Sequence, residues 1–508
     1  MEFYPKDDLD ISFIKPNIES KIQQIYSGCH IFLTGSTGFI GKFLLEKLLR
    51  SCDIAQVYIL IRQKKGMASD ERLEYLFQSV FFERLLIANK NARNLITLIE
   101  GDLTLPDLGL SQGDLNILHN KIDFVFHCAA TLNMMEHLRT AININVNATM
   151  FLLEQAKLMK KLKAFVYVST AYSHAMLYNI EEKFYPTKYN AEEIKLIVNT
   201  NNDDQLTALT PQLLEDWPNT YVFTKAIAEN LVSTYHEIPV VVVRPAQIIS
   251  SVFEPLKGYV DNIYGPIATT LGAATGFLKV WSCDGNVKSF VIPVDIVVNS
   301  ILSIAWYTVS YKTNSTENLL RVFNLVPSKD KIISINHNFE KFREVFCKEK
   351  VYSSYTIGPY NMKCVKNESL YRFFFILFHV IPPFFVDVVL KLFGYKQRVL
   401  PIYRKVYLAN KILAYFCTKD YNFSDKNSGK LWSLMNSKDK EIFNFDQNSY
   451  TYEEYYRNCV RGGRVYLTKD PMDTVPAATK RYKRVIFLNI LFKAAFYLII
   501  GIFFINFI

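Results

Sequence analysis

The sequence has few cysteines and glycines and no paired metal-binding motif. Its 508 residues include 8 cysteines and 19 glycines. No two cysteines form a CxxC pair and no cysteine–histidine cluster has zinc spacing, so we predict no metal site. Sparse glycine, sparse cysteine and the lack of heptads exclude the collagen-like, disulfide-rich and coiled-coil classes. Half of the residues are hydrophobic and 21% are charged, which excludes disorder for most of the chain.

Neither a secretory signal nor a nucleic-acid-binding pattern is present. Residues 1–28 lack a basic segment followed by an apolar run, so we expect a reducing compartment and reduced thiols. The net charge is +10, but no arginine-rich stripe with interleaved aromatics occurs, and no nucleic acid is expected as a partner. Part of the charge is local, because Lys480, Arg481, Lys483 and Arg484 stand just before the last apolar run.

That last run, residues 485–508, contains a single charged residue, Lys493. As a helix it would be about 36 Å long, enough for a hydrocarbon core of about 30 Å. We predict a C-terminal transmembrane helix, with an interfacial or core helix as the alternative. The basic residues before it should stay in the cytosol, which places the body of the protein there. A second apolar stretch, residues 371–393, contains Pro382-Pro383, which favours a buried or hairpin-like segment over a straight span.

Strand and helix patterns alternate over the first half of the chain. Short apolar, β-branched segments predict strands at residues 29–34, 57–61, 95–100, 122–128, 163–169 and 239–243. Helical patterns lie between them, for instance at residues 42–50, 145–162 and 221–235. This alternation predicts an α/β fold, a doubly wound parallel sheet of the Rossmann type with helices on both faces.

A glycine-rich turn follows the first predicted strand. Gly35, Gly38 and Gly41 have GxxGxxG spacing, a variant of the dinucleotide-binding pattern. The first glycine permits the tight turn, the second admits a pyrophosphate, and the third lets the helix pack on the sheet. The helix N-terminus would offer free N–H groups to the phosphates. We therefore expect cofactor contacts from Gly35, Thr37, Gly38, Phe39, Ile40 and Gly41.

The residues after the second strand indicate which dinucleotide binds. An NAD-binding unit would place a carboxylate about 20 residues after the turn, but this chain has Arg62 there, with Lys65 nearby. A guanidinium suits a 2′-phosphate, so the sequence favours NADPH over NADH. Further cofactor contacts are expected at Asp102, which could meet the adenine, and at Leu103, Ala129, Ala130 and Asn145.

Tyr221 and Lys225 form a YxxxK pair on one face of a predicted helix. Hydride addition to a carbonyl leaves an oxyanion that needs a proton, and a nearby ammonium would lower the phenol pKa from its usual value of about 10. Thr170, or Ser169 beside it, ends the fifth strand and would orient the carbonyl. These four residues are the predicted catalytic set. Tyr221 and Lys225 are also expected to contact the nicotinamide ribose.

Together these motifs resemble the extended short-chain dehydrogenase/reductase class, and finer features resemble the fatty acyl-CoA reductases of eukaryotes. The resemblance covers about residues 25–470 and the apolar tail. One departure is visible, because Tyr450-Thr451-Tyr452-Glu453-Glu454-Tyr455 stands where the family often has Trp-x-x-Tyr, which bears on acyl-chain preference. The segments that carry the resemblance are residues 34–41, 60–66, 168–172, 218–225, 243–245, 293–299, 381–387, 392–394 and 463–467.

The resemblance implies a membrane-bound enzyme that reduces a long-chain fatty acyl-CoA to a fatty alcohol with two NADPH, through an aldehyde. The family's catalytic Tyr and Lys fall on Tyr221 and Lys225, and its active-site hydroxyl on Thr170 or Ser169. The expected partners are the acyl-CoA and a lipid bilayer, in the endoplasmic reticulum or peroxisome. The oligomeric state is left open. On apolar content, residues 246–290 and 371–393 are candidates for an acyl tunnel.

The expected organisation has four segments. Residues 1–28 form a lead-in, and residues 29–345 an NADPH-binding Rossmann domain with a substrate-binding portion at about 246–330. Residues 346–470 form a mostly helical domain, and residues 471–508 a basic linker and membrane anchor. Three alternatives share parts of this pattern: a membrane-bound sterol or hydroxysteroid dehydrogenase, a reductase that stops at the aldehyde, and a catalytically silent NADPH-binding scaffold.

Overall fold

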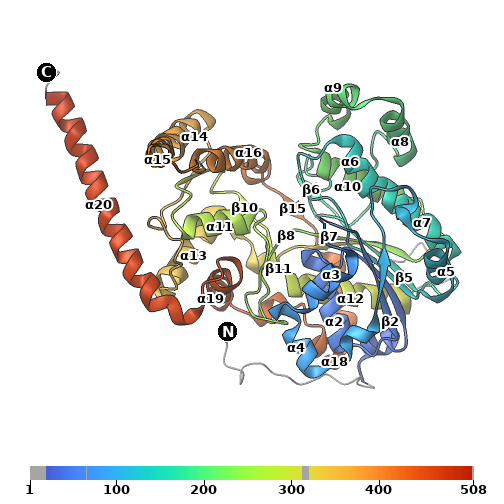
Figure 1. Cartoon of the computed structure of the whole chain (residues 1–508). Coiled ribbons are helices and arrows are strands. Elements are labelled where there is room, and N and C mark those ends of the chain that lie inside the picture. Colours follow the sequence, from blue (N-terminus) through green and yellow to red (C-terminus); the bar gives the residue numbers. More distant parts are fainter. Residues whose placement is uncertain (1–18, 65, 312–319, 397, 506–508) are drawn as a thin grey trace.

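The computed structural model describes residues 19–64, 66–311, 320–396 and 398–505 (Figure 1). For residues 492–493 and 495–505 it describes the backbone alone. Lys65, most of the predicted lead-in and the end of the predicted membrane anchor therefore lie outside the described side chains.

Seven parallel strands form the central sheet, in the order β12-β7-β5-β4-β1-β2-β3. The predicted doubly wound parallel sheet is confirmed. The strand order reverses between β1 and β4, and in such sheets dinucleotides bind at the crevice outside the strand ends there. The strands are β1 His30–Thr34, β2 Gln56–Ile61, β3 Ile96–Glu100, β4 Phe124–His127, β5 Ala164–Val168, β7 Val240–Pro245 and β12 Val322–Leu325.

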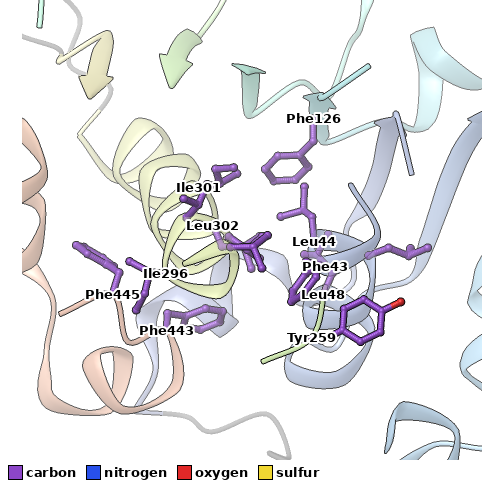
Figure 2. Packing of buried hydrophobic residues seen from close by; sticks show 14 of the residues in the cluster. Phe43, Leu44, Leu48, Phe126, Tyr259, Ile296, Ile301, Leu302, Phe443 and Phe445 are labelled. Atoms are coloured by element: carbon purple, nitrogen blue, oxygen red, sulfur yellow. The ribbon is translucent and has the colours of Figure 1, made fainter. Parts of the chain in front are cut away.

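Alternate strand residues pack into two apolar layers, one on each face of the sheet. Ile31 and Leu33 of β1 enter the first layer, and Phe32 between them enters the second. Figure 2 shows the first layer, where Phe43 on α2 and Leu302 on α12 meet beneath the sheet. The first layer is covered by α1 Lys21–Tyr26, α2 Phe39–Ser51 and α12 Val294–Ser310, and the second by α5 Gln112–Lys121, α7 Ala148–Leu158 and α10 Thr220–Ser233.

Three local differences from the sequence prediction have physical causes. Helix α2 begins at Phe39 rather than at residue 42, because Gly38 already serves as its N-cap. The helix expected at residues 145–162 begins with a π-helical turn, Asn143–Asn147, and ends at Leu158. The polar insertion at residues 184–219 contains two helices, α8 Ala191–Thr200 and α9 Asp203–Leu214, each with an asparagine N-cap.

The seventh strand, β12, lies within residues 246–330, which the sequence suggested as a substrate-binding portion. Around it are short parallel or antiparallel pairs that extend the body beyond the sheet. The remaining elements up to residue 349 are α3 Ser69–Phe77, α4 Val80–Ala88, α6 Leu138–Ile142, β6 Asn179–Ile180, β8 Gln247–Ile249, α11 Pro266–Ala274, β9 Val280–Ser282, β10 Lys288–Ser289, β11 Val291–Pro293, β13 Ile333–Ser334 and α13 Ile335–Glu349.

The C-terminal part of the chain is mostly helical, as predicted. A short strand pair, β15 with β6, ties it to the Rossmann body. Its elements are β14 Lys363–Val365, α14 Glu368–Phe375, α15 Ile381–Leu392, α16 Val399–Thr418, β15 Asn422–Phe423, α17 Lys426–Leu434, α18 Ser437–Ile442, α19 Tyr452–Gly462, the π-helical turn Gly463–Leu467 and α20 Val475–Ile505.

Residues 368–392 form one helical run, so the expected break at Pro382-Pro383 is wrong. A π-helical turn at Ile376–Val380 precedes the two prolines, which then occupy the first turn of α15. Prolines fit there because N–H groups in a first turn have no intrahelical acceptor. The chain reverses after Leu392 instead, at Gly394 with φ +78°. Asp387 accepts hydrogen bonds from the backbone N–H groups of residues 398, 399 and 400, which joins α15 to α16.

Candidate functional site

The glycine turn between β1 and α2 leaves no room for a side chain at Gly35 or at Gly41. Gly35 has φ +76°, and a Cβ placed on it would lie 2.7 Å from the Ala129 backbone nitrogen. A Cβ on Gly41 would overlap the Gly35 carbonyl oxygen. Gly38 donates its N–H to the Gly35 carbonyl at 2.8 Å and caps α2 without a side chain. The start of α2 is therefore open to a phosphate, and Thr37 and Gly38 are exposed beside it.

Two arginines lie beside this turn. The guanidinium of Arg62, 46% exposed, lies 3.3 Å from the Asp102 carboxylate. Arg72, on α3, donates to the Arg62 carbonyl at 2.5 Å and to the Thr37 hydroxyl at 3.2 Å. Burial and the Arg62 charge both lower the pKa of Arg72, so an anion placed between the two arginines would be favoured. Sequence reasoning missed Arg72, because it stands eleven residues beyond the strand end, inside a helix.

Asp102 and Leu103 follow β3 at the same edge of the sheet. Asp102 accepts from the backbone N–H and the hydroxyl of Thr104, both at 2.9 Å. Burial opposes ionisation of Asp102, but these bonds and Arg62 outweigh it and lower its pKa. Leu103 packs against the second apolar layer. Asp102 therefore both orders its loop and faces Arg62, at the end of a strand two positions from β1.

Ala129 and Ala130 follow β4 and are half-buried beside Gly35. The N–H of Ala129 donates to the Thr34 hydroxyl at 3.2 Å. Asn145 is buried under the same loop. It accepts from the Thr131 N–H at 3.0 Å and donates to the Thr224 hydroxyl at 2.9 Å. Asn145 thus ties the loop after β4 to α10, the helix that carries Tyr221.

Tyr221 and Thr170 meet at the carboxyl edge of the sheet, across from the glycine turn. Asn219 accepts from the Val222 N–H at 3.1 Å and so starts α10 immediately before Tyr221. The Thr170 hydroxyl faces the Tyr221 phenol and acts to lower its pKa. Thr170 is buried and Tyr221 is half-buried. Two hydroxyls on facing elements thereby converge, which is the arrangement needed to hold a carbonyl oxygen.

The expected effect of Lys225 on the phenol is wrong in this structure. Burial raises the pKa of Tyr221 to about 12, although the neighbouring Thr170 hydroxyl opposes the rise. The Lys225 ammonium instead donates to the Val168 carbonyl at 2.7 Å and to the Tyr167 hydroxyl at 3.3 Å. Burial lowers the pKa of Lys225 to about 8. Tyr221 is therefore a protonated phenol at neutral pH, the state required of a proton donor.

Ser169, the alternative to Thr170, points elsewhere. Its hydroxyl donates to the Glu229 carboxylate. Glu229 also receives the Arg244 guanidinium, whose Nη2 lies 2.5 Å away, and both side chains are almost completely buried. Burial disfavours the Glu229 carboxylate, but Arg244 and His174 outweigh it and lower its pKa to about 2. Sequence reasoning missed this ion pair, although Glu229 follows Tyr221 by eight residues on one helix.

Arg244 links the pair to two further segments. Its guanidinium donates to the carbonyls of Glu181 at 3.0 Å and Lys183 at 2.9 Å. Since Glu229 is on α10, Ser169 follows β5 and Arg244 is on β7, one buried charge pair fixes the helix against two strands. The positions of Tyr221 on α10 and Thr170 after β5 depend on how the ion pair holds the helix against these strands.

Family comparison places the chain among known sequences. An NAD-binding family model described as male sterility protein matches residues 33–301, and a second model of that description matches residues 378–470. Fatty acyl-CoA reductase wat of Drosophila melanogaster is 34% identical over 485 residues, 94% of this chain and 92% of that protein. Fatty acyl-CoA reductase 1 of Mus musculus is 34% identical over 472 residues, 91% and 89% of the two chains.

Solved structures share the fold at low identity. The terminal R domain of the myxalamid PKS-NRPS pathway matches with a TM-score of 0.55 and 18% identity, over 88% of this chain and 93% of that one. The reductase domain of a non-ribosomal peptide synthetase from Mycobacterium tuberculosis matches with a TM-score of 0.53 and 18% identity, over 91% and 96%. These matches support the Rossmann-like reductase fold. The two family models, and the identities of 34% over nearly the whole chain, show that this protein is a member of the fatty acyl-CoA reductases, within the extended short-chain dehydrogenase/reductase family.

Proposed function

We propose that this protein reduces a long-chain fatty acyl-CoA to a fatty alcohol with NADPH, releasing CoA and passing through an aldehyde. The observation that carries the proposal is the contact between the Tyr221 phenol and the Thr170 hydroxyl, at the edge of the sheet that also holds the glycine turn. The relatives named above are fatty acyl-CoA reductases, which supports the substrate class.

Bound NADPH would supply the hydride, with its phosphates at the Gly35–Gly41 turn and its 2′-phosphate between Arg62 and Arg72. Thr170 and Tyr221 hold the thioester oxygen by two hydrogen bonds, and Tyr221 gives it a proton as negative charge develops. The resulting hemithioacetal loses the CoA thiol and leaves an aldehyde, which the same two hydroxyls hold for a second reduction. Lys225 is a candidate partner for the nicotinamide ribose.

The test uses the full chain in yeast microsomes with palmitoyl-CoA and NADPH deuterated at the transferred position. We expect hexadecanol carrying two deuteriums on C1, which also excludes a reductase that stops at the aldehyde. Release of labelled hexadecanal alone would restrict the activity to the first step. Reduction of a 3-ketosteroid without thiol release would identify a steroid dehydrogenase instead, and NADPH binding without either product would identify a silent scaffold.

Arg62 is expected to select NADPH over NADH. Replacing Arg62 with alanine should raise the Kd for NADPH about 10- to 100-fold, because a charge-assisted pair with the 2′-phosphate is lost. The Kd for NADH should change less than about twofold. Binding is measured by cofactor fluorescence, and Arg93→Ala, which removes an arginine paired with Glu74 away from the turn, is the control. Equal weakening of both cofactors would refute this role for Arg62.

We further propose that the protein is anchored in a bilayer by α20. Tyr482 near its start stacks on Tyr352, with ring centroids 3.8 Å apart, and the helix then projects from the body (Figure 1). Lys480, Arg481, Lys483 and Arg484 precede the exposed apolar residues Phe487, Leu488, Ile490 and Leu491. Basic residues followed by an apolar helix are typical of an anchor with its body in the cytosol. The proposed membrane is the endoplasmic reticulum or the peroxisome.

A second membrane contact is proposed at α14 and α15. Among the residues that the structure describes, only the helical run Glu368–Leu392 is long and apolar enough to cross a bilayer. Only 22% of its most apolar stretch is buried. Its exposed side chains include Phe373, Phe384 and Phe385. Lys391 lies in its last turn, and Lys396 and Arg398 follow it. An apolar helix face with basic residues at its edge suits an anionic bilayer surface.

Phe385 is predicted to enter the hydrocarbon region. In the full chain with exposed Cys347 changed to serine, a fluorophore attached through Phe385→Cys should shift to the blue in liposomes and be quenched by doxyl-labelled lipids. The matched control is Leu196→Cys, because Leu196 is 63% exposed and Phe385 is 62% exposed. A blue shift in detergent without lipid quenching would show that two copies of the chain cover this face, contrary to the proposal.

A further inference from the structure

An apolar pocket lies beyond the catalytic edge of the sheet. It lies between α11, α13, α19 and the π-helical turn Gly463–Leu467, and it is partly open to solvent. Its walls are largely aliphatic and aromatic, for example Leu271, Phe342 and Val460. A pocket of this character suits a hydrocarbon chain.

Strand β8 connects the pocket to the catalytic residues. Ala246, just before β8, packs against the same apolar cluster as Tyr221. The side chain of Gln247 faces the phenol of Tyr172, two residues after Thr170, and partly offsets the burial that raises its pKa. At the other end of β8, Ile249 and Ser250 line the pocket. Three strand residues span about 10 Å, so an extended chain held at its carbonyl by Thr170 reaches the pocket after roughly eight carbons.

Several polar groups in the pocket wall are paired with protein groups, whereas the Thr356 hydroxyl and the Arg464 Nε have no hydrogen-bond partner among the described residues. Cys459 and Ser250 form a hydrogen bond of 2.9 Å, and the Tyr456 hydroxyl donates to Asn338 at 2.5 Å. The Arg464 guanidinium donates to the carbonyls of Tyr352 and Pro471. A chain without polar groups can therefore lie against these side chains without competing for their bonds.

We infer that this pocket holds the hydrocarbon chain of the acyl substrate and limits its length at Gly463. The inference rests on the proposed function. It replaces the tunnel expected from apolar content, since α14 and α15 do not contribute to the lining and residues 338–356 and 456–468 do. Residues 249–275 of the expected segment 246–290 are present in the wall.

Gly463 offers a direct way to shorten the pocket. A Cβ built on it meets no atom within 4 Å, and its φ of −58° is ordinary for a helix. Gly463→Leu therefore adds a side chain into open space without backbone strain. Gly429, on α17, is the matched control, because a Cβ there also meets nothing within 4 Å and the residue is exposed away from the pocket. Both changes remove a glycine from a helix, which is favourable or neutral for folding.

The experiment measures kcat/KM against acyl chain length in membranes that carry the full chain. For Gly463→Leu we expect kcat/KM for octadecanoyl-CoA to fall at least about tenfold while that for decanoyl-CoA changes less than about twofold. Gly463→Ala should give a smaller loss in the same direction, and Gly429→Leu none. An unchanged profile, or equal loss at all lengths, would overturn the inference.

Binding of a pyrene-labelled dodecanoyl-CoA separates the pocket from the chemistry. Its Kd should rise at least about fivefold in Gly463→Leu, and should stay unchanged in Gly429→Leu, whether or not turnover occurs. If the wild-type protein binds the probe in this way but reduces no acyl-CoA, the pocket holds and the proposed reaction fails. If it reduces acyl-CoA but Gly463→Leu leaves both measurements unchanged, the reaction holds and the pocket assignment fails.

Discussion

Replacing Tyr221 with phenylalanine is expected to lower kcat for acyl-CoA reduction about 10²- to 10⁴-fold, the usual contribution of a positioned proton donor. The phenol pKa is raised to about 12 by burial, so its proton is present throughout the physiological range. Phenylalanine keeps the ring and removes that proton together with one of the two hydrogen bonds to the substrate oxygen. The Kd for NADPH should change little, since the glycine turn and the two arginines, Arg62 and Arg72, would bind its phosphates away from Tyr221.

Two further variants locate this effect at the hydroxyl pair. Thr170→Val should give a smaller loss of kcat, because Tyr221 keeps its proton but loses the partner that orients it. Tyr178→Phe, at an exposed tyrosine away from the site, should leave kcat unchanged. Normal alcohol production by Tyr221→Phe would remove the phenol from the mechanism.

Replacing Glu229 with glutamine is expected to destabilise the protein by about 3–5 kcal/mol, the usual cost of leaving a buried charge without its partner. Arg244 and Glu229 are exposed by 0% and 1%, and Arg244 would be left with two backbone carbonyls in place of a carboxylate. Since the pair fixes α10 against β5 and β7, activity should fall with stability. The measurement is thermal unfolding of the purified full chain in lipid nanodiscs.

The pH dependence distinguishes a lost ion pair from a general packing defect. The pKa of Glu229 is lowered from 4.5 to about 2 in the folded state, so its contribution is fully present above pH 4.5 and is lost as the pH falls toward 2. The difference between wild type and Glu229→Gln should therefore shrink over that interval. Glu237→Gln, at a half-exposed pair with Lys157, should cost less than about 1 kcal/mol. A difference that stays constant with pH would contradict this account of the pair.

The sheet and the glycine turn could be predicted because their signals are local. Buried parallel strands are short β-branched runs, and the spacing of Gly35, Gly38 and Gly41 between a strand and a helix has one common use. Strand β12 escaped prediction because four residues, Val322–Leu325, carry little periodicity. It joins the sheet through pairing with β7, a contact between residues about 80 positions apart.

The catalytic pair could be predicted in residue type but not in detail. The choice between Thr170 and Ser169 depends on which hydroxyl faces α10, and neighbouring residues at a strand end point to opposite sides. The pKa of Tyr221 is set mainly by burial, and the Lys225 ammonium donates to the Val168 carbonyl. The YxxxK spacing predicts neither feature. Arg72 and Glu229 join the site only through tertiary packing. The pocket at Gly463 is likewise formed by helices distant in sequence.

The most direct test of the central claim counts the NADPH oxidised for each CoA thiol released, with palmitoyl-CoA as substrate and the full chain in membranes. The account predicts that two NADPH are oxidised per thiol released and that hexadecanol is the product. The Tyr221→Phe variant should release neither the CoA thiol nor hexadecanol at an appreciable rate. Thiol release without NADPH oxidation, or NADPH oxidation with no thiol released, would contradict the assignment of Tyr221 and Thr170 to reduction of a thioester.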